Sequence, residues 1–145
     1  MLRQGNRLME KIIDELVVDN SDHISEIRSR IREICVREGA GAVKQTKMVT
    51  ACAEILRNTL NFADGGEIKI KKVTKNDSGE TSLIFVVRDK GPGIDDPEKA
   101  IKPGWSGPRS KGLGKGLSGS KNLSDEFELE SVPGEGTTVT MRFNL

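Results

Sequence analysis

The sequence predicts a single α+β domain with a mostly antiparallel sheet, and three observations support this fold class. The 145 residues suit one domain with one core. Two long segments in the first half repeat apolar residues at helical spacing, and shorter segments carry β-branched or alternating patterns. The last two short segments flank a four-residue turn and predict a hairpin. We expect helices at about 22–39 and 43–62, and strands at 12–18, 67–73, 82–88, 127–132 and 137–143.

The first predicted helix follows a short β-branched segment, residues 12–18, which is typical of an edge strand. A cluster of capping residues, Asp19–Asp22, precedes the helix, and Gly39 ends it. His23 lies in the first turn, where an exposed helix-start residue is favoured over a pH sensor or a phosphoacceptor. One face of the helix is apolar and carries Ile24, Ile27, Ile31 and Ile34.

The second predicted helix is apolar around most of its circumference, which indicates a central position in the fold. Its main apolar face carries Val49, Cys52, Ala53, Leu56 and Leu60. The two cysteines of the chain, Cys35 and Cys52, both fall within apolar helical patterns. This favours two buried, reduced thiols over a disulfide or a metal-binding pair.

The second half of the chain alternates strands with turns. Residues 67–73 alternate polar and apolar side chains, and a turn at 76–79 leads into the strongly apolar segment 82–88. We expect these two strands to be antiparallel, with 82–88 central in the sheet. Short helical segments are expected within 95–101, opened by acidic residues, and within 118–124.

Composition excludes several classes of function. Charged residues make up 31% of the chain and hydrophobic residues 34%, with a formal net charge of +1. The five aromatic residues are scattered, so we expect no nucleic-acid partner. No apolar run is long enough to span a membrane, and a cytoplasmic location is expected. Residues 1–10 are polar and predict a loosely held extension before a domain of residues 11–145.

Two polar residues stand out on the apolar second helix. Glu54 and Asn58 are four positions apart and therefore share one face. A carboxylate beside a carboxamide is costly to bury unless a polar group occupies the space between them. The functional interpretation is a general base next to an oxygen ligand for Mg²⁺, which takes few protein oxygens. A polar pair that faces solvent is the alternative.

A carboxylate ends the strand 82–88 and begins a glycine-rich turn. Asp89 is followed by Gly91 and Gly93 on either side of Pro92. A carboxylate only accepts hydrogen bonds, so it selects a ligand that donates, such as an exocyclic amine. The glycines let a ring lie against the backbone. An ordinary turn that begins with Asp is the alternative.

Three alternate glycines form the most distinctive stretch, Gly112-Leu113-Gly114-Lys115-Gly116-Leu117. Glycine lets the backbone approach an anion closely, and a helix that starts just after the loop offers unpaired N–H groups. The stretch matches neither a Walker A loop nor a Rossmann fingerprint, and a plain loop is the alternative. The preceding residues 102–111 are rich in Gly, Pro, Ser and basic residues and are expected to form a lid, with Trp105 inside it.

Four motifs in this order resemble the Bergerat-type ATP-binding domain of the GHKL superfamily, which is shared by DNA gyrase, histidine kinases and MutL. Glu54-x-x-x-Asn58 resembles its N box, and Asp89-x-Gly91-x-Gly93 its first glycine box. Gly112-x-Gly114-x-Gly116 and Gly134-x-Gly136-Thr137 resemble the second and third. The resemblance covers about residues 12–144. It implies a two-layer sandwich with a mixed, mostly antiparallel sheet and helices on one face.

Within this superfamily the run from Gly112 to Phe127, with the later Ser-Val-Pro-Gly-Glu-Gly-Thr, is similar to the RsbT-type switch kinases and to the anti-sigma kinases RsbW and SpoIIAB. The resemblance implies a kinase that uses Mg-ATP to phosphorylate a Ser or Thr of a STAS-domain antagonist in a partner-switching pathway. It also admits a PP2C-type phosphatase activator target and a homodimer. The alternative is an anti-sigma factor that sequesters a sigma subunit. A detached histidine-kinase ATPase domain, autophosphorylated on His23, is disfavoured.

The resemblance also implies a role for individual residues. Glu54 would act as the base for the acceptor hydroxyl, and Asn58 would coordinate Mg²⁺ between the phosphates. Asp89 would accept a hydrogen bond from the adenine amine. The remaining cofactor-binding positions would be Gly91, Gly93, Ile94 and Thr137 around the adenine, and Gly112, Leu113, Gly114, Lys115, Gly116 and Leu117 around the triphosphate.

Overall fold

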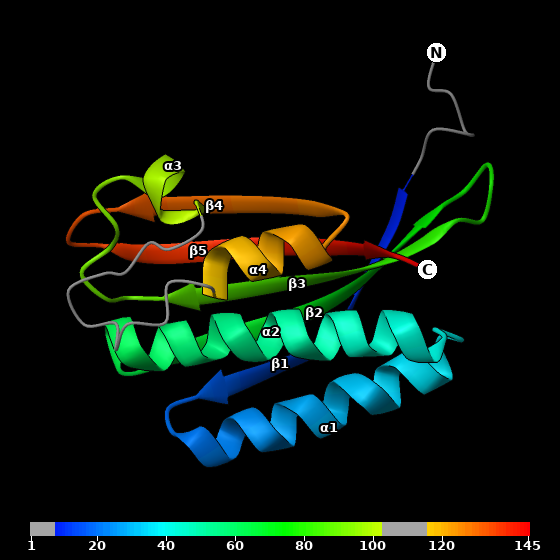
Figure 1. Cartoon of the computed structure of the whole chain (residues 1–145). Coiled ribbons are helices and arrows are strands. Elements are labelled where there is room, and N and C mark those ends of the chain that lie inside the picture. The colour runs from blue at the N-terminus through cyan, green and yellow to red at the C-terminus, as the bar shows by residue number, and fades with distance from the viewer. Residues whose placement is uncertain (1–7, 103–115) are drawn as a thin grey trace.

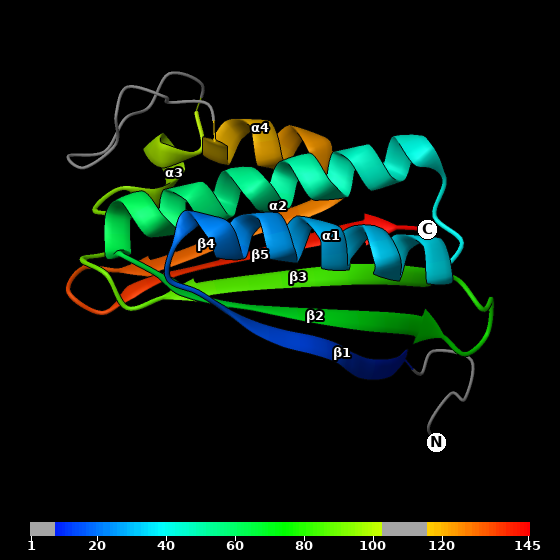
Figure 2. The same cartoon turned by 90° about the horizontal axis from the view of Figure 1, so that it is seen from below.

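The computed structural model describes residues 8–102 and 116–145 as a two-layer α+β fold (Figures 1 and 2). A five-stranded sheet with the strand order β1-β2-β3-β5-β4 forms one layer, and the helices cover one of its faces. The predicted fold class is confirmed. The sheet is not mixed, however, because all four pairings between described strands are antiparallel.

The elements follow the predicted order, with bounds that differ by a few residues at most positions. The strands are β1 (Leu8–Val18), β2 (Gly66–Lys75), β3 (Thr81–Asp89), β4 (Glu126–Val132) and β5 (Gly136–Asn144). The helices are α1 (Ser21–Arg37), α2 (Ala42–Ala63), α3 (Pro97–Ala100) and α4 (Gly116–Leu123). β3 is central and β1 lies at an edge, both as predicted.

β1 begins four residues before the predicted strand. Its first residues, Leu8–Glu10, pair with Val73–Lys75 of β2, so part of the predicted extension belongs to the sheet. These residues are exposed and do not alternate between buried and exposed positions, because they lie at the edge of the sheet. A register shift between Ile12 and Asp14 further disturbs the pattern. Residues 1–7 lie outside the described part of the chain.

Local capping positions the two long helices. Asn20 begins α1, since its side-chain Oδ1 accepts a hydrogen bond from the backbone N–H of His23 at 3.1 Å. His23 lies in the first turn, as predicted, but its side chain is only 29% exposed because the ring contacts Asp19 at 3.0 Å. Asp64 caps the C-terminus of α2 and adopts a left-handed conformation with φ of 61°.

The core lies between the sheet and the helix layer, with α2 at its centre. α2 packs against α1 on one side and α4 on the other, and both neighbours are visible beside it in Figure 2. The rings of Phe85 and Phe143 meet edge to face on the sheet, with centroids 5.7 Å apart. Within residues 8–102 and 116–145, no helix has the length and apolarity that crossing a bilayer requires.

Both cysteines are buried and free, as predicted. Cys35 of α1 contacts Met48 of α2, with 3.8 Å between the two sulfur atoms. Burial raises the pKa of the Cys35 thiol and raises that of Cys52 strongly. Both thiols therefore stay protonated and behave as small apolar side chains of the core.

Candidate functional site

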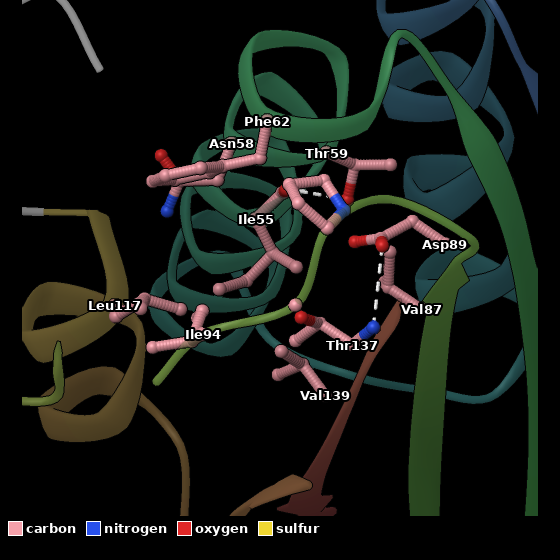
Figure 3. Close-up of a pocket in the computed structure, with 12 residues that line it drawn as sticks. Ile55, Asn58, Thr59, Phe62, Val87, Asp89, Ile94, Leu117, Thr137 and Val139 are labelled. Carbon is pink, nitrogen blue, oxygen red and sulfur yellow. Dashed lines mark hydrogen bonds between the residues drawn. The ribbon is translucent and has the colours of Figure 1, made fainter. Parts of the chain in front are cut away.

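A narrow pocket lies between the C-terminal half of α2 and the adjoining end of the sheet (Figure 3). The hollow comprises about 400 Å³ with its open mouth included, but only about 20 Å³ is wide enough for the centre of a water molecule. A ligand as large as a purine ring therefore needs the walls to separate slightly. Twelve residues from five parts of the chain line it: Ile55, Asn58, Thr59, Phe62, Val87, Asp89, Pro92, Gly93, Ile94, Leu117, Thr137 and Val139.

Asp89 supplies the only carboxylate among these lining residues. One of its oxygens, Oδ1, accepts hydrogen bonds from the backbone N–H groups of Gly91 at 2.9 Å and Thr137 at 3.2 Å. The other oxygen, Oδ2, has no hydrogen-bond partner within the described part of the chain. Figure 3 shows this second oxygen directed into the pocket. The carboxylate is therefore held in place through one oxygen and presents the other as an acceptor.

The loop after β3 is docked on the turn between β4 and β5. Gly134 donates its backbone N–H to the Pro92 carbonyl at 2.8 Å, and Ile94 donates to the Ser131 hydroxyl at 2.7 Å. Gly93 has a φ of +78°, and a Cβ placed there would lie 2.5 Å from the Val132 carbonyl oxygen. Only glycine satisfies both conditions, so the loop backbone reaches the turn directly.

The hydroxyl of Ser131 connects this loop to the start of β5. Besides accepting from Ile94, it lies 3.1 Å from the Gly136 carbonyl and 2.8 Å from the Thr137 hydroxyl. The backbone N–H of Thr137 also reaches Asp89. Thr137 is thus fixed at the pocket wall. Ser131 was missed, because its role depends on two segments of the chain that meet only in the folded protein.

Gly91 is not among the residues that line the pocket. A Cβ at this position would lie 2.5 Å from the Cβ of Ala63, the last residue of α2. Glycine is therefore needed so that the loop can pass the end of the helix. Gly93 and Ile94 do line the pocket.

Asn58 and Glu54 lie one helical turn apart on α2 but face different surroundings. Asn58 lines the pocket, as Figure 3 shows. Glu54 does not; its side chain is 38% exposed and its Oε1 forms an ion pair with Arg57 at 2.6 Å. The two residues have the predicted spacing of one helical turn. Only Asn58 lines the pocket, however, and Glu54 lies on the outer side of the helix.

The apolar walls from α2 were not predicted as part of the site. Ile55 and Phe62 are three residues before and four residues after Asn58 and line the same pocket. This spacing places them on one helix face with Asn58, so helical periodicity could have identified them. Val87 and Val139 come from paired positions on β3 and β5. The sheet register therefore decides their proximity.

Within the described residues, only the end of the glycine stretch lies at the pocket. α4 begins at Gly116, two residues before the predicted helix, and Leu117 is buried and lines the pocket. The hydroxyl of Ser120 donates to the Ala51 carbonyl at 3.1 Å, which ties α4 to α2. The other predicted phosphate-binding residues, Gly112, Leu113, Gly114 and Lys115, lie outside the described residues, as does most of the predicted lid, including Trp105.

A metal ion at this site would depend on few protein ligands. Within residues 8–102 and 116–145, no three His, Cys, Asp or Glu side chains gather in a metal-binding cluster. The oxygen of the Asn58 carboxamide at the pocket wall is of the ligand type that Mg²⁺ takes, together with phosphate and water. The donor set fits a magnesium ion bound with a phosphate ligand better than a metal bound by protein alone.

Comparison with known proteins agrees with this geometry. Residues 17–143 match the histidine kinase-like ATPase domain. The chain belongs to this family. The match extends from the end of β1 to the end of β5, so it includes every element that lines the pocket. The predictions of the superfamily and of its ATP-binding fold are confirmed.

Within this family, the chain is similar to a serine/threonine kinase and to anti-sigma factors. The chain is 43% identical to the serine/threonine-protein kinase RsbT of Bacillus subtilis over 108 residues, which cover 74% of this chain and 78% of RsbT. It is 34% identical to the anti-sigma F factor of Thermoanaerobacter sp. (strain X514) over 93 residues, covering 63% of this chain and 64% of that protein. The predictions of a protein serine/threonine kinase and of a relationship to anti-sigma factors are confirmed.

Solved structures share the fold at low sequence identity. The RsbU and RsbW domains of a Mycobacterium tuberculosis protein match 90% of this chain and 32% of theirs, with a TM-score of 0.55 and 16% identity. The SiaB–SiaC complex from Pseudomonas aeruginosa matches 92% of this chain and 91% of the matched chain, with a TM-score of 0.55 and 15% identity. These matches support the fold.

Proposed function

We propose that the chain binds Mg-ATP in the pocket beside α2 and transfers the γ-phosphate to a Ser or Thr of a STAS-domain antagonist. The observation that carries the proposal is the Oδ2 of Asp89, which has no partner among the described residues and is an acceptor held at the wall of an otherwise mainly apolar slot. The similarity to RsbT supports the choice of a protein hydroxyl as the acceptor.

The pocket chemistry matches an adenine ring. The Oδ2 of Asp89 would accept a hydrogen bond from the exocyclic amine, which only a donor-bearing base provides. Ile55, Ile94 and Val139 offer apolar surface to the faces of the ring. The Thr137 backbone and hydroxyl hold the wall behind the base through Asp89 and Ser131.

The magnesium site and the phosphate loop extend the same proposal. Asn58 would hold Mg²⁺ through its carboxamide oxygen, and the bound metal would neutralise charge on the phosphates. Gly112, Leu113, Gly114 and Lys115 would surround the triphosphate together with Gly116 and Leu117 at the start of α4. The N-terminus of α4 favours an anion there.

Glu54 is proposed as the base for the acceptor hydroxyl. Its Oε1 is paired with Arg57, while Oε2 has no partner within the described residues. The free oxygen would accept the hydroxyl proton as the acceptor oxygen attacks the γ-phosphorus and the bond to the β–γ bridging oxygen breaks. Because Glu54 is partly exposed, a second protein can reach it from the outer side of α2.

A second candidate function is sequestration of a sigma subunit, with ATP shaping the interface. The similarity to anti-sigma F factors favours it. A stable complex with a sigma factor would support this function, whereas a switch kinase would release its partner after transfer. A phosphatase activator of the PP2C type as downstream target, and a homodimer, belong to the same proposal.

Transfer of labelled γ-phosphate from Mg-ATP tests the proposal. The chain is incubated with STAS-domain proteins from the same organism, and label is sought on Ser or Thr. Label on one STAS-domain protein supports the kinase and identifies its substrate. ATP binding without any labelled STAS-domain protein contradicts the kinase proposal and directs the next test to sigma-factor capture.

Gly93→Ala is expected to weaken ATP binding and to lower stability, because the added Cβ meets the Val132 carbonyl and must displace the docked loop. Gly79→Ala is a matched control. Gly79 has a similar φ of +74°, but no atom lies within 4 Å of its Cβ position. Both variants carry left-handed backbone strain of about 1–2 kcal/mol, so both lose stability. Isothermal titration calorimetry should show reduced ATP affinity only for Gly93→Ala; equal affinity in the two variants would contradict the docking argument.

A further inference from the structure

α2 presents one exposed stripe that includes Glu54. Every member is exposed or half-buried, while α1, α4 and the sheet cover most of the remaining helix surface from Met48 onward. The stripe follows the 3.6-residue period with spacings of three and four residues, so its side chains lie one above the other. Its members are Val43, Lys47, Thr50, Glu54, Arg57 and Asn61.

A second exposed stripe lies beside the first on α1. Ser29, Arg32 and Val36 follow the same spacing and are all exposed. The contact between Cys35 and Met48 places the C-terminal half of α1 against the N-terminal half of α2. Figure 2 shows the two helices side by side over the same face of the sheet. Both stripes therefore belong to the outer surface of the helix layer.

Four residues at one end of this surface, Arg32, Val36, Val43 and Lys47, form what we call the basic-apolar patch. Val36 and Val43 are 69% and 71% exposed, the highest values among the large apolar residues that the structure describes. Arg32 and Lys47 are exposed and form no ion pair within residues 8–102 and 116–145. A cation nearby on α1 behaves differently, since Arg30 is paired with Asp14 and Glu33.

We propose that the basic-apolar patch is the docking surface for an acidic face of the acceptor protein. The inference rests on the proposed function, because it takes Glu54 as the group that the acceptor hydroxyl must reach. A stable interface covers about 800 Å² on each partner, roughly 30 Å across. Lys47 lies about 10 Å and Val43 about 16 Å along the helix from Glu54, at a rise of 1.5 Å per residue. An interface of this size centred near Glu54 therefore includes Lys47 and ends close to Val43, at the edge of the patch.

The chemistry of the patch determines the character of the partner. Two unpaired cations beside two exposed valines fit a partner surface with carboxylates around an apolar centre. Complementary charges accelerate encounter and orient the partner, and like charges repel it. The patch would thus bind the acceptor through contacts separate from the nucleotide pocket.

The test uses the double variant Arg32→Glu/Lys47→Glu in steady-state transfer to the STAS-domain protein that the wild-type chain labels. The KM for this protein is expected to rise about 10- to 100-fold, while the KM for ATP and kcat at saturating acceptor stay within about twofold. The wild-type KM should also rise with salt, and this dependence should weaken in the variant.

Lys11→Glu/Lys75→Glu is the matched control. It introduces the same change in net charge on β1 and β2, outside the stripes on α1 and α2, so it separates local docking from the overall field of the protein. Lys75 also loses its ion pair with Glu80 in this control. Thermal melts check that both double variants remain folded. An unchanged KM for the acceptor in Arg32→Glu/Lys47→Glu, or an equal rise in the control, would overturn the proposal.

Two further outcomes would also count against the docking surface, and each has its own signature. If sedimentation shows that Arg32→Glu/Lys47→Glu changes self-association, the patch is a contact between copies of this chain. If the wild-type chain labels no STAS-domain protein, the proposed kinase function fails first, and the docking proposal fails with it. In contrast, labelling by the wild-type chain with an unchanged acceptor KM in the variant removes only the docking proposal.

Discussion

Replacing Glu54 with alanine is expected to reduce phosphoryl transfer by about 10²–10⁴-fold while leaving ATP affinity within about twofold. The carboxylate lies outside the pocket lining, so its removal should spare the nucleotide. It is the acidic side chain nearest in sequence to Asn58 on α2, and its Oε2 has no partner within the described residues. Single-turnover transfer with saturating acceptor measures the chemical step directly, and calorimetry measures ATP affinity in the same preparation.

Two companion variants separate the base from its ion pair. Arg57→Ala breaks the same 2.6 Å pair but keeps the carboxylate, so it should retain most of the transfer rate. Glu54→Gln keeps the shape but cannot take a proton at neutral pH, so it should resemble Glu54→Ala. If Arg57→Ala is as slow as Glu54→Ala, the ion pair itself is required and the role of Glu54 as the base is wrong.

The second large effect is expected at Asp89. In Asp89→Asn the side-chain oxygen can still accept from Gly91 and Thr137, while the amide group replaces the free acceptor that faces the pocket. Loss of a buried hydrogen bond to adenine costs about 1–3 kcal/mol, which is a roughly 5- to 150-fold weaker affinity for ATP. Asp89→Ala should weaken the affinity for ATP further, because it also removes the two hydrogen bonds from Gly91 and Thr137 that hold the loop. Calorimetric titration with ATP compares the two variants with the wild type.

Inosine triphosphate provides a sharper test of Asp89. Its base carries a carbonyl oxygen where adenine carries the amine, so the wild-type carboxylate should reject it. The donor amide of Asp89→Asn should accept it, and the preference for ATP over inosine triphosphate should fall or reverse. An equal preference in the wild type and Asp89→Asn would show that this side chain does not contact the base. Urea denaturation of each variant separates affinity from loss of stability.

The helices were the most predictable part of the fold. Four isoleucines on α1 and the apolar surface of α2 recur at helical spacing because each helix buries one continuous face. The first residues of β1 were missed for the opposite reason. Leu8–Glu10 are exposed at the sheet edge, and their conformation comes from pairing with β2 and not from an apolar pattern of their own.

In the candidate site, too, some features could be predicted from the sequence and others could not. Asp89 and Asn58 could be assigned to the pocket because a polar group at the end of a buried strand or on an apolar helix is unusual enough to be noticed. The close approach of Gly91 to Ala63 could not be predicted from the sequence, because it depends on how closely the loop passes the end of α2. The ion pair between Glu54 and Arg57 was within reach of sequence analysis, since the two residues are three apart on a helix.

The position of Asn58 and Glu54 on one helix has a consequence for how partners can be exchanged. In the proposed mechanism, four residues of continuous α2 backbone set the distance between the nucleotide side and the acceptor side of the reaction. This distance does not depend on how α1 or the sheet packs. Substitutions on the outer surface of α1 can therefore redirect the kinase to another protein without dismantling its chemistry. The choice of partner protein could therefore be changed by redesigning this surface alone.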